Sequence, residues 1–463
     1  MSKGPQAFST KYYHFKSLLM SEGWMTPAYV GVDDAGVVRS ISQQPPEHLA
    51  IIEPVNGLAV PGFKNCHSHA FQYAMAGMAE KHAEGAKDDF WSWREAMYQC
   101  ALSLDADQIQ TVATALYIDL LKKGYTHVAE FHYLHHDKNG KPYSNYAETS
   151  VALLAAAALA GIRITLVPVF YQRGGFGKDA LPRQRRFIFS SVDDYFRLLE
   201  EAASVVKPIS TSTLGFGVHS LRAAETDDLL RIWDQGPAHL PFHIHAAEQL
   251  KEVEDCLAHL GMRPVEWLVK HMDLSDRVNI VHCTHLVDDE VQALARSRAN
   301  AVLCPGTEGN LGDGIFRLTD YMKHDGNWCI GTDSHISMNP LEDLRWLDYG
   351  QRLLTHRRNT FDDGGFTMIR KAFFCGSRAM GLERNELFEV GHPLDAVVYD
   401  STARFLTELS NTFSLSRILY TADTRSILGT LVNGKWVVKE GHHPEDEQIG
   451  SSFRQTLRAI TIG

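Results

Sequence analysis

Two pairs of closely spaced histidines are the first feature of this sequence that could do chemistry. His67 and His69 follow an apolar run at residues 58–66, and His243 and His245 lie in the apolar segment PFHIHA. Side chains at positions i and i+2 of a strand point to the same side, so each pair can offer two imidazoles to one point. A pair of this kind on its own is more often two polar residues leaving a strand than two metal ligands.

Acidic residues follow other strand-like runs and strengthen the metal interpretation. Within the second pair, His245 is the expected ligand because it lies nearer the carboxyl end, whereas His243 should be a deeper, hydrogen-bonded wall residue. Glu248, three residues on, could shuttle protons near a metal. The segments VHCTH and GTDSH end two more apolar runs, and the second offers Asp333. An aspartate after a strand usually caps a helix, but it could also bind a divalent ion and accept a proton from water.

These segments can meet only if the chain closes into a barrel. Apolar runs alternate with helix-like stretches, which predicts parallel strands joined by helical crossovers. Eight such units make a (β/α)8 barrel, whose active sites lie at the carboxyl ends of the strands. The runs are residues 58–66, 126–133, 162–171, 213–220, 241–246, 278–283, 301–305 and 328–332. Three histidines and one aspartate would then converge on a single zinc ion that keeps one position open for water.

The two ends of the chain predict a smaller second unit. Short alternating segments occur near the amino terminus, and similar ones follow residue 390, including a predicted turn at Asn433–Gly434. We therefore expect an α/β fold. In it, residues 58–389 form a metal-dependent (β/α)8 TIM barrel, and residues 1–57 and 390–463 form a small β-sandwich domain.

Composition excludes several classes of protein. The 463 residues carry 45 Lys and Arg against 56 Asp and Glu, a net charge of −11, so we expect no nucleic acid or membrane partner. No apolar run approaches the ~20 residues of a membrane helix. The 7 cysteines form no CxxC pair, which favours free thiols in the cytoplasm. The RQRR stretch at residues 183–186 and the pair His135–His136 are interpreted as solvated turns.

The order of motifs, HxH, HxAE, HCTH and TDS, resembles the deaminase branch of the metal-dependent amidohydrolase superfamily. Further blocks narrow the resemblance to the formimidoylglutamate deiminases of histidine degradation, most strongly over residues 58–355. The blocks are AFQYAMAGMAE, FWSWREAMY, EFHYLHHD, VHSLRA, HIHAAEQ, TEGNLGDGIF and DSHISMNPLEDLRWLDYGQRL.

The resemblance implies an activity and a set of site residues. The activity is zinc-dependent hydrolytic deimination of N-formimino-L-glutamate to N-formyl-L-glutamate and ammonia, with one zinc ion per chain. The implied metal ligands are His67, His69, His245 and Asp333. The implied catalytic residues are His282, Asp333 and Glu248. The residues implied to surround the substrate are Gln72, Arg94, Tyr133, His219 and Arg222. This chain has Thr307-Glu308-Gly309-Asn310 where many deaminases of the superfamily carry another Asn-containing segment, so the role of Glu308 stays open.

The chemistry of the substrate can be examined independently of the resemblance. A site for two carboxylates and a cationic amidine needs fixed positive donors at one end, and the planar guanidinium of arginine suits a carboxylate. Arg94 lies in an aromatic-rich loop after the first predicted strand, Arg222 follows the fourth, and Tyr133 ends the second. All three fall on the mouth side. The alternative is that Arg94 pairs with Glu95 and Arg222 with Glu225.

Two other functions compete with deimination. A deaminase of an aromatic base or nucleoside, such as guanine or an adenosine derivative, would use the same zinc ligands but needs flat apolar walls. A non-catalytic scaffold would be expected to lose metal ligands, and here every candidate position is filled.

The sequence leaves open the partner of Glu130, which should be buried in the second strand, and the residue that protonates ammonia. It also leaves open the identity of the metal, and a homodimer is possible.

Overall fold

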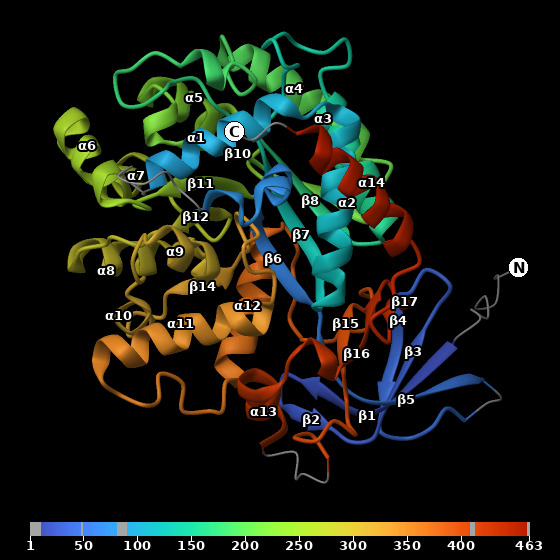
Figure 1. The fold of residues 1–463 in the computed structure, drawn as a ribbon. Coiled ribbons are helices and arrows are strands. Elements are labelled where there is room, and N and C mark those ends of the chain that lie inside the picture. The colour runs from blue at the N-terminus through green and yellow to red at the C-terminus, as the bar shows by residue number, and fades with distance from the viewer. Residues whose placement is uncertain (1–10, 48–49, 81–89, 408–412, 461–463) are drawn as a thin grey trace, which may run out of the picture.

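The computed structural model describes residues 11–47, 50–80, 90–407 and 413–460, which form a barrel and a smaller sheet beside it (Figure 1). Within these residues, eight parallel strands follow one another around the barrel. They are β6 (Phe63–Ser68), β7 (Tyr125–His132), β8 (Arg163–Phe170), β10 (Phe216–Ser220), β11 (Phe242–Ala246), β12 (Val278–His282), β13 (Asn300–Leu303) and β14 (Asn327–Ile330). The predicted (β/α)8 architecture is confirmed.

Two predicted strands differ in their bounds. The run at 58–66 is divided, because residues up to Pro61 belong to β5 (Ile51–Pro61) of the smaller sheet. The run at 213–220 is broken at Gly215, whose backbone N–H donates to Leu166 O at 2.8 Å. This leaves β9 (Ser212–Leu214) paired with β8 alone, before β10 begins.

Helices connect and cover the strands. Those before β11 are α1 (Phe90–Ser103), α2 (Ala106–Lys122), α3 (Glu148–Ala160), α4 (Val192–Val206) and α5 (Thr226–Gln235). Those up to β14 are α6 (Leu250–Leu260), α7 (Pro264–His271), α8 (Asp288–Ser297), α9 (Pro305–Leu311) and α10 (Leu318–Met322). The last are α11 (Pro340–Thr355), α12 (Phe366–Ala379), α13 (Ser414–Thr421) and α14 (Asp446–Ala459). None of the described helices is long and apolar enough to cross a membrane.

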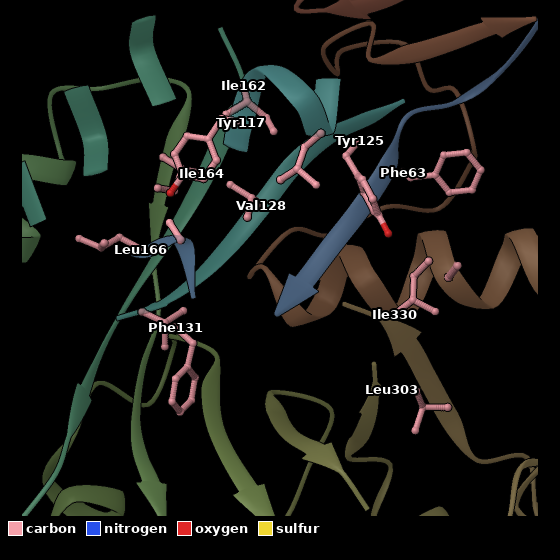
Figure 2. Packing of buried hydrophobic residues seen from close by; sticks show 14 of the residues in the cluster. Phe63, Tyr117, Tyr125, Val128, Phe131, Ile162, Ile164, Leu166, Leu303 and Ile330 are labelled. Carbon is pink, nitrogen blue, oxygen red and sulfur yellow. The ribbon is translucent and has the colours of Figure 1, made fainter. Parts of the chain in front are cut away.

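The core explains why the strands appear in the sequence as nearly continuous apolar runs. Every residue of β7 and β8 is buried, because helices cover one face and the barrel interior fills the other. Figure 2 shows Phe131, Ile164 and Leu166 among the packed side chains of these strands. All seven cysteines are free and buried, as predicted.

The barrel closes between β6 and the segment that follows β14. The backbone N–H groups of Thr332 and Asp333 donate to His67 O at 3.1 and 3.0 Å, and His69 N–H donates to Asp333 O at 3.2 Å. Gly331 lies so close to His67 that a Cβ there would be 2.8 Å from the His67 backbone nitrogen. The contact that closes the barrel therefore runs through the predicted metal ligands.

The smaller sheet combines both ends of the chain, as predicted. Its strand order is β17-β16-β15-β5-β1-β3-β4, with β2 paired to β1. Besides β5, the strands are β1 (Lys11–Met20), β2 (Gly23–Met25), β3 (Ala28–Val32), β4 (Val38–Ser42), β15 (Ala396–Asp400), β16 (Ile427–Val432) and β17 (Lys435–Lys439). The division at residues 57/58 and 389/390 stays a prediction, and its first boundary falls inside β5.

The predicted solvated turns are largely wrong, because only Arg183 of their six residues is exposed. Arg186 is fully buried, and its guanidinium donates to His136 O at 2.8 Å, to Leu104 O at 2.6 Å and to Ala101 O. His135 and His136 are buried as well. Backbone carbonyls from two separate segments, the end of α1 and the residues after β7, replace water around Arg186, and the local sequence carries no sign of them.

We predict that Gly331→Ala weakens the closure of the barrel. The added methyl group would meet backbone atoms, so the free energy of unfolding should fall by about 1–3 kcal/mol and metal content should fall with it. Chemical denaturation and metal analysis of the purified variant measure both quantities. The control is Gly450→Ala in α14, where the nearest atom is the flexible end of Arg454 at 3.5 Å. Equal stability of the two variants would contradict the prediction.

Candidate metal centre and active site

Four side chains from three parts of the barrel converge at its mouth. The Nε2 atoms of His67 and His69, at the end of β6, lie 3.1 Å apart, and His245 Nε2 of β11 lies 3.0 Å from His67 Nε2. Asp333 Oδ1, beyond β14, lies 3.6 Å from His67 Nε2 and 3.3 Å from His69 Nε2. The structure brings together all four residues that the sequence suggested as metal ligands.

The protonation of the histidines fits a metal ion. His69 Nδ1 is 2.9 Å from Phe131 O and His245 Nδ1 is 2.9 Å from His219 O, and a carbonyl can only accept a hydrogen bond. Each Nδ1 therefore carries the proton and leaves a lone pair on Nε2. Burial lowers the pKa of all three imidazoles, that of His69 to about 3, and keeps them neutral. Lone pairs this close repel one another unless a cation lies between them, and zinc–nitrogen bonds of ~2.0–2.1 Å suit this spacing.

The backbone is strained where the chain presents Asp333 and His282. Their φ angles are 52° and 73°, and Cys283 follows with 56°, all in the left-handed region that non-glycine residues rarely adopt.

Burial, together with Glu248 and Glu308, raises the pKa of Asp333 to about 7. A carboxyl group with a pKa near neutrality can exchange a proton during a reaction.

His282 lies among three carboxylates. Its Nε2 is 3.6 Å from Glu248 Oε1 and 3.7 Å from Asp333 Oδ2, and its Nδ1 is 3.3 Å from Glu308 Oε1. Burial opposes a charge on His282, but the carboxylates outweigh it and raise the pKa to about 10. Glu308 also accepts the Cys304 backbone N–H at 2.9 Å, so it is held in place by α9 and fixes the ring of His282.

Asp313 is a residue that sequence reasoning missed. It is buried just beyond α9, accepts a hydrogen bond from Gln249, and offers an oxygen within 4.8 Å of ligand atoms of Glu248 and His282. Burial and the nearby Glu248 raise the pKa of Asp313 to about 9. Its surrounding sequence, Gly-Asp-Gly, reads as an ordinary turn and gives no signal of this position.

A cavity of about 500 Å³ opens beside the candidate metal ligands, and His69, His245 and Asp333 line it. All five residues implied to surround the substrate line it: Gln72, Arg94, Tyr133, His219 and Arg222. Sequence reasoning missed several further members of the wall, among them Tyr98, Tyr171 and Phe187. A second hollow adjoins the first and shares Arg94 and Arg222 with it.

Arg94 does not lie in a loop, as the sequence suggested, but on helix α1. Trp93, Arg94, Met97 and Tyr98 all line the cavity because residues four apart share one face of a helix. Recognising the helix would have identified Tyr98 from its spacing to Arg94. The suggested pairing with Glu95 is not seen, since Glu95 binds Arg183 at 2.7 Å.

Arg222 is buried beside two acidic residues that differ from the expected one. Its Nη2 lies 3.4 Å from Glu248 Oε2, and its Nη1 lies 3.4 Å from Glu252 Oε2. The expected partner, Glu225, instead binds Arg173 at 2.7 Å. Arg222 therefore connects Glu248, the candidate proton carrier, to the wall of the cavity.

The structure also identifies the surroundings of Glu130 and His243. Glu130 accepts hydrogen bonds from Ser68 Oγ at 2.7 Å, from Ala70 N–H at 2.6 Å and from Tyr117 at 3.1 Å. It thereby holds both neighbours of His69, Ser68 through its side chain and Ala70 through its backbone. His243 Nε2 lies 2.9 Å from Ala379 O, which confirms it as a hydrogen-bonded wall residue.

Comparison with known sequences agrees with the geometry. The sequence pattern of the Amidohydrolase family matches residues 58–437. A formimidoylglutamate deiminase from Pseudomonas aeruginosa is 42% identical over 445 residues, which cover 95% of this chain and 97% of that protein. A 5-methylthioadenosine/S-adenosylhomocysteine deaminase from Pelotomaculum thermopropionicum is 23% identical over 422 residues, or 88% of each chain.

Solved structures share the fold. An amidohydrolase from Brucella melitensis superposes with a TM-score of 0.89 at 36% identity, covering 97% of this chain and 99% of that one. An adenosine deaminase from Xanthomonas campestris with bound zinc superposes with a TM-score of 0.82 at 20% identity, covering 97% and 98%. At that identity the second likeness concerns the fold alone.

We predict that the two histidines of β11 differ in their effect on metal binding. His245→Gln should weaken metal binding about 100-fold or more, because it removes the imidazole lone pair that points toward the other candidate ligands. The matched control, His243→Gln, keeps a donor for Ala379 O and should retain metal. Metal analysis after dialysis against a weak chelator measures both. Comparable loss in the two variants would exclude His245 as a specific ligand.

Proposed function

Because the chain belongs to the amidohydrolase family, we propose that it is a formimidoylglutamate deiminase, which hydrolyses N-formimino-L-glutamate to N-formyl-L-glutamate and ammonia. One observation carries this proposal beyond the family: the cavity joins a metal-type cluster at its floor to two arginines in its wall. That arrangement suits a reacting amidine at one end and two carboxylates at the other.

We propose further that the ion is zinc, one per chain, held by His67, His69, His245 and Asp333. A zinc ion held by these residues would lower the pKa of water at the site from ~15.7 toward ~7. The neutral imidazoles and their converging lone pairs support this assignment.

The residues around the cluster divide the proton transfers between them. Asp333 accepts the proton of the attacking water, and His282 Nε2, 3.7 Å from Asp333 Oδ2, donates a hydrogen bond to the water oxygen. Glu248 accepts a hydrogen bond from the amidine nitrogen and orients the formimino carbon for attack. Asp333 then gives this proton to the amino nitrogen of the tetrahedral intermediate, and the carbon–nitrogen bond breaks to release ammonia. As the formyl carbonyl forms, the hydroxyl proton of the intermediate passes to the freed carboxylate of Asp333. Holding the reacting groups in place lowers the activation free energy by several kcal/mol. Full orientation of reactants is worth about 7 kcal/mol or more.

Hydrogen-bond donors surround the end of the substrate that carries the carboxylates. Arg94, Arg222 and Tyr133 hold the two carboxylates, while Gln72 and His219 shape the space between them. The seven buried, unpaired thiols support a reducing, cytoplasmic setting for the enzyme.

Ammonia release from a panel of substrates tests the activity. We expect release from N-formimino-L-glutamate and little from guanine, cytosine or an adenosine derivative, because the latter offer no carboxylates to the two arginines. Metal content is measured on the same sample. Zinc-loaded protein that releases no ammonia from N-formimino-L-glutamate, yet acts on a base, would favour the base-deaminase alternative.

Asp333→Asn should nearly abolish turnover, by a factor of about 1,000 or more, because the amide cannot accept the proton of water. Circular dichroism and the melting temperature should show that the fold is retained. Turnover at the wild-type rate would remove Asp333 from the mechanism.

Arg222→Met should raise KM for N-formimino-L-glutamate more than KM for formamidine, an amidine without carboxylates. The variant also leaves Glu248 and Glu252 without their buried cation. We therefore expect kcat/KM to fall for both substrates, in addition to the difference in KM between them. Steady-state kinetics on both compounds separate the two effects. Equal losses would exclude Arg222 as a carboxylate ligand.

A further inference from the structure

A buried glutamine lies directly behind the wall of the cavity. Gln184 belongs to the short segment after β8 that the sequence suggested was a solvated turn, yet it is fully buried. Its side chain touches two tyrosines of the wall: Nε2 is 3.0 Å from the Tyr98 hydroxyl and 2.9 Å from the Tyr171 hydroxyl. Its Oε1 is 2.7 Å from the backbone nitrogen of Leu181.

The backbone of Leu181 fixes which way the amide of Gln184 points. A backbone N–H can only donate, so the amide oxygen must face Leu181 and the amide nitrogen must face the tyrosines. That nitrogen carries two hydrogens, one for each hydroxyl. Each tyrosine oxygen therefore accepts a hydrogen bond from Gln184 and has to direct its own hydrogen elsewhere.

The cavity is the place to which that hydrogen can be directed. Among the described residues, neither hydroxyl donates to a backbone carbonyl or a carboxylate. Both hydroxyls contact the same Gln184 nitrogen, and a hydrogen bond between them would use one of their two hydrogens at most. Burial raises the pKa of Tyr98, which keeps its hydroxyl protonated. At least one O–H donor therefore faces the cavity that Arg94 and Arg222 also line.

We propose that Gln184 is a positioning residue that sets Tyr98 and Tyr171 as hydrogen-bond donors to a carboxylate of the substrate. The inference rests on the proposed function, since it concerns how the same site selects a dicarboxylate. A hydroxyl can donate or accept, and a wall of uncommitted hydroxyls would also suit amides and alcohols. Because Gln184 occupies one acceptor position of each oxygen and leaves the hydrogen free, the tyrosine pair favours an acceptor-only group such as a carboxylate.

Gln184→Glu reverses the direction of these hydrogen bonds while keeping the shape of the side chain. A carboxylate can still accept from Leu181 N–H, but it would draw both tyrosine hydrogens away from the cavity. We expect KM for N-formimino-L-glutamate to rise about tenfold more than KM for formamidine, with a smaller change in kcat, as for a lost contact to the bound substrate. Equal changes in KM for the two substrates would overturn the proposal.

A double variant separates hydrogen-bond direction from charge. Tyr98→Phe/Tyr171→Phe removes both hydroxyls and should itself raise KM for N-formimino-L-glutamate selectively. Adding Gln184→Glu to it should then have much less effect than in the wild-type background. An undiminished effect would mean that the added charge alone is responsible. The control is Tyr321→Phe, which removes a buried hydroxyl bonded to Asn327 O at 3.1 Å and should leave KM unchanged.

Binding of glutarate distinguishes a failure of this inference from a failure of the proposed function. Calorimetry with glutarate measures recognition of a dicarboxylate without any reaction. Weaker glutarate binding in Gln184→Glu, with Tyr321→Phe unchanged, supports the role of Gln184 whatever the reaction is. Normal turnover of N-formimino-L-glutamate with unaltered KM and glutarate affinity in Gln184→Glu would refute the inference and leave the function standing.

Discussion

The closure of the barrel is the contact on which the rest of this structure depends. Two backbone N–H groups after β14 donate to His67 O, and the return bond from His69 completes the pairing. Because His67, His69 and Asp333 are themselves the residues that pair, the cylinder cannot close without bringing together three of the four candidate metal ligands. The stability of the barrel and the geometry of the candidate metal site therefore depend on the same row of hydrogen bonds, and Gly331 allows the close approach.

The charge around the cavity is distributed unevenly, and this shapes what it can hold. Glu248, Glu308, Asp313 and Asp333 gather around His282 near the floor, whereas arginine and tyrosine donors occupy the wall. Buried carboxylates so close together are costly unless cations or protons accompany them. A metal ion and a cationic amidine supply positive charge at the floor, and carboxylates supply negative charge at the wall. The site is therefore complementary to a molecule whose two ends carry opposite charge.

Periodic features of the fold could be predicted from the sequence, and contacts between distant segments could not. The eight strands were recognisable because burial on both faces makes each an apolar run, and His67 and His69 because a strand repeats every two residues. Arg186 and Gln184 were misjudged because their partners, such as Leu104 O and Tyr98, come from elsewhere in the chain. A local pattern rich in arginine resembles a solvated turn until the carbonyls that replace water are known. Arg94 was misplaced for a simpler reason, since aromatic residues obscured the helical spacing of α1.

The smaller sheet has a consequence for how the protein is made. β5 lies between β1 and β15, so one of its edges is satisfied by residues near the amino terminus and the other by residues beyond 395. On the ribosome, the segment that leads into the first barrel strand emerges early with one edge open, and most of the barrel is synthesised before its neighbour arrives. An open edge of this kind attracts other strands. Between the synthesis of β5 and that of β15, this edge of a nascent chain is therefore open to association with strands of other chains.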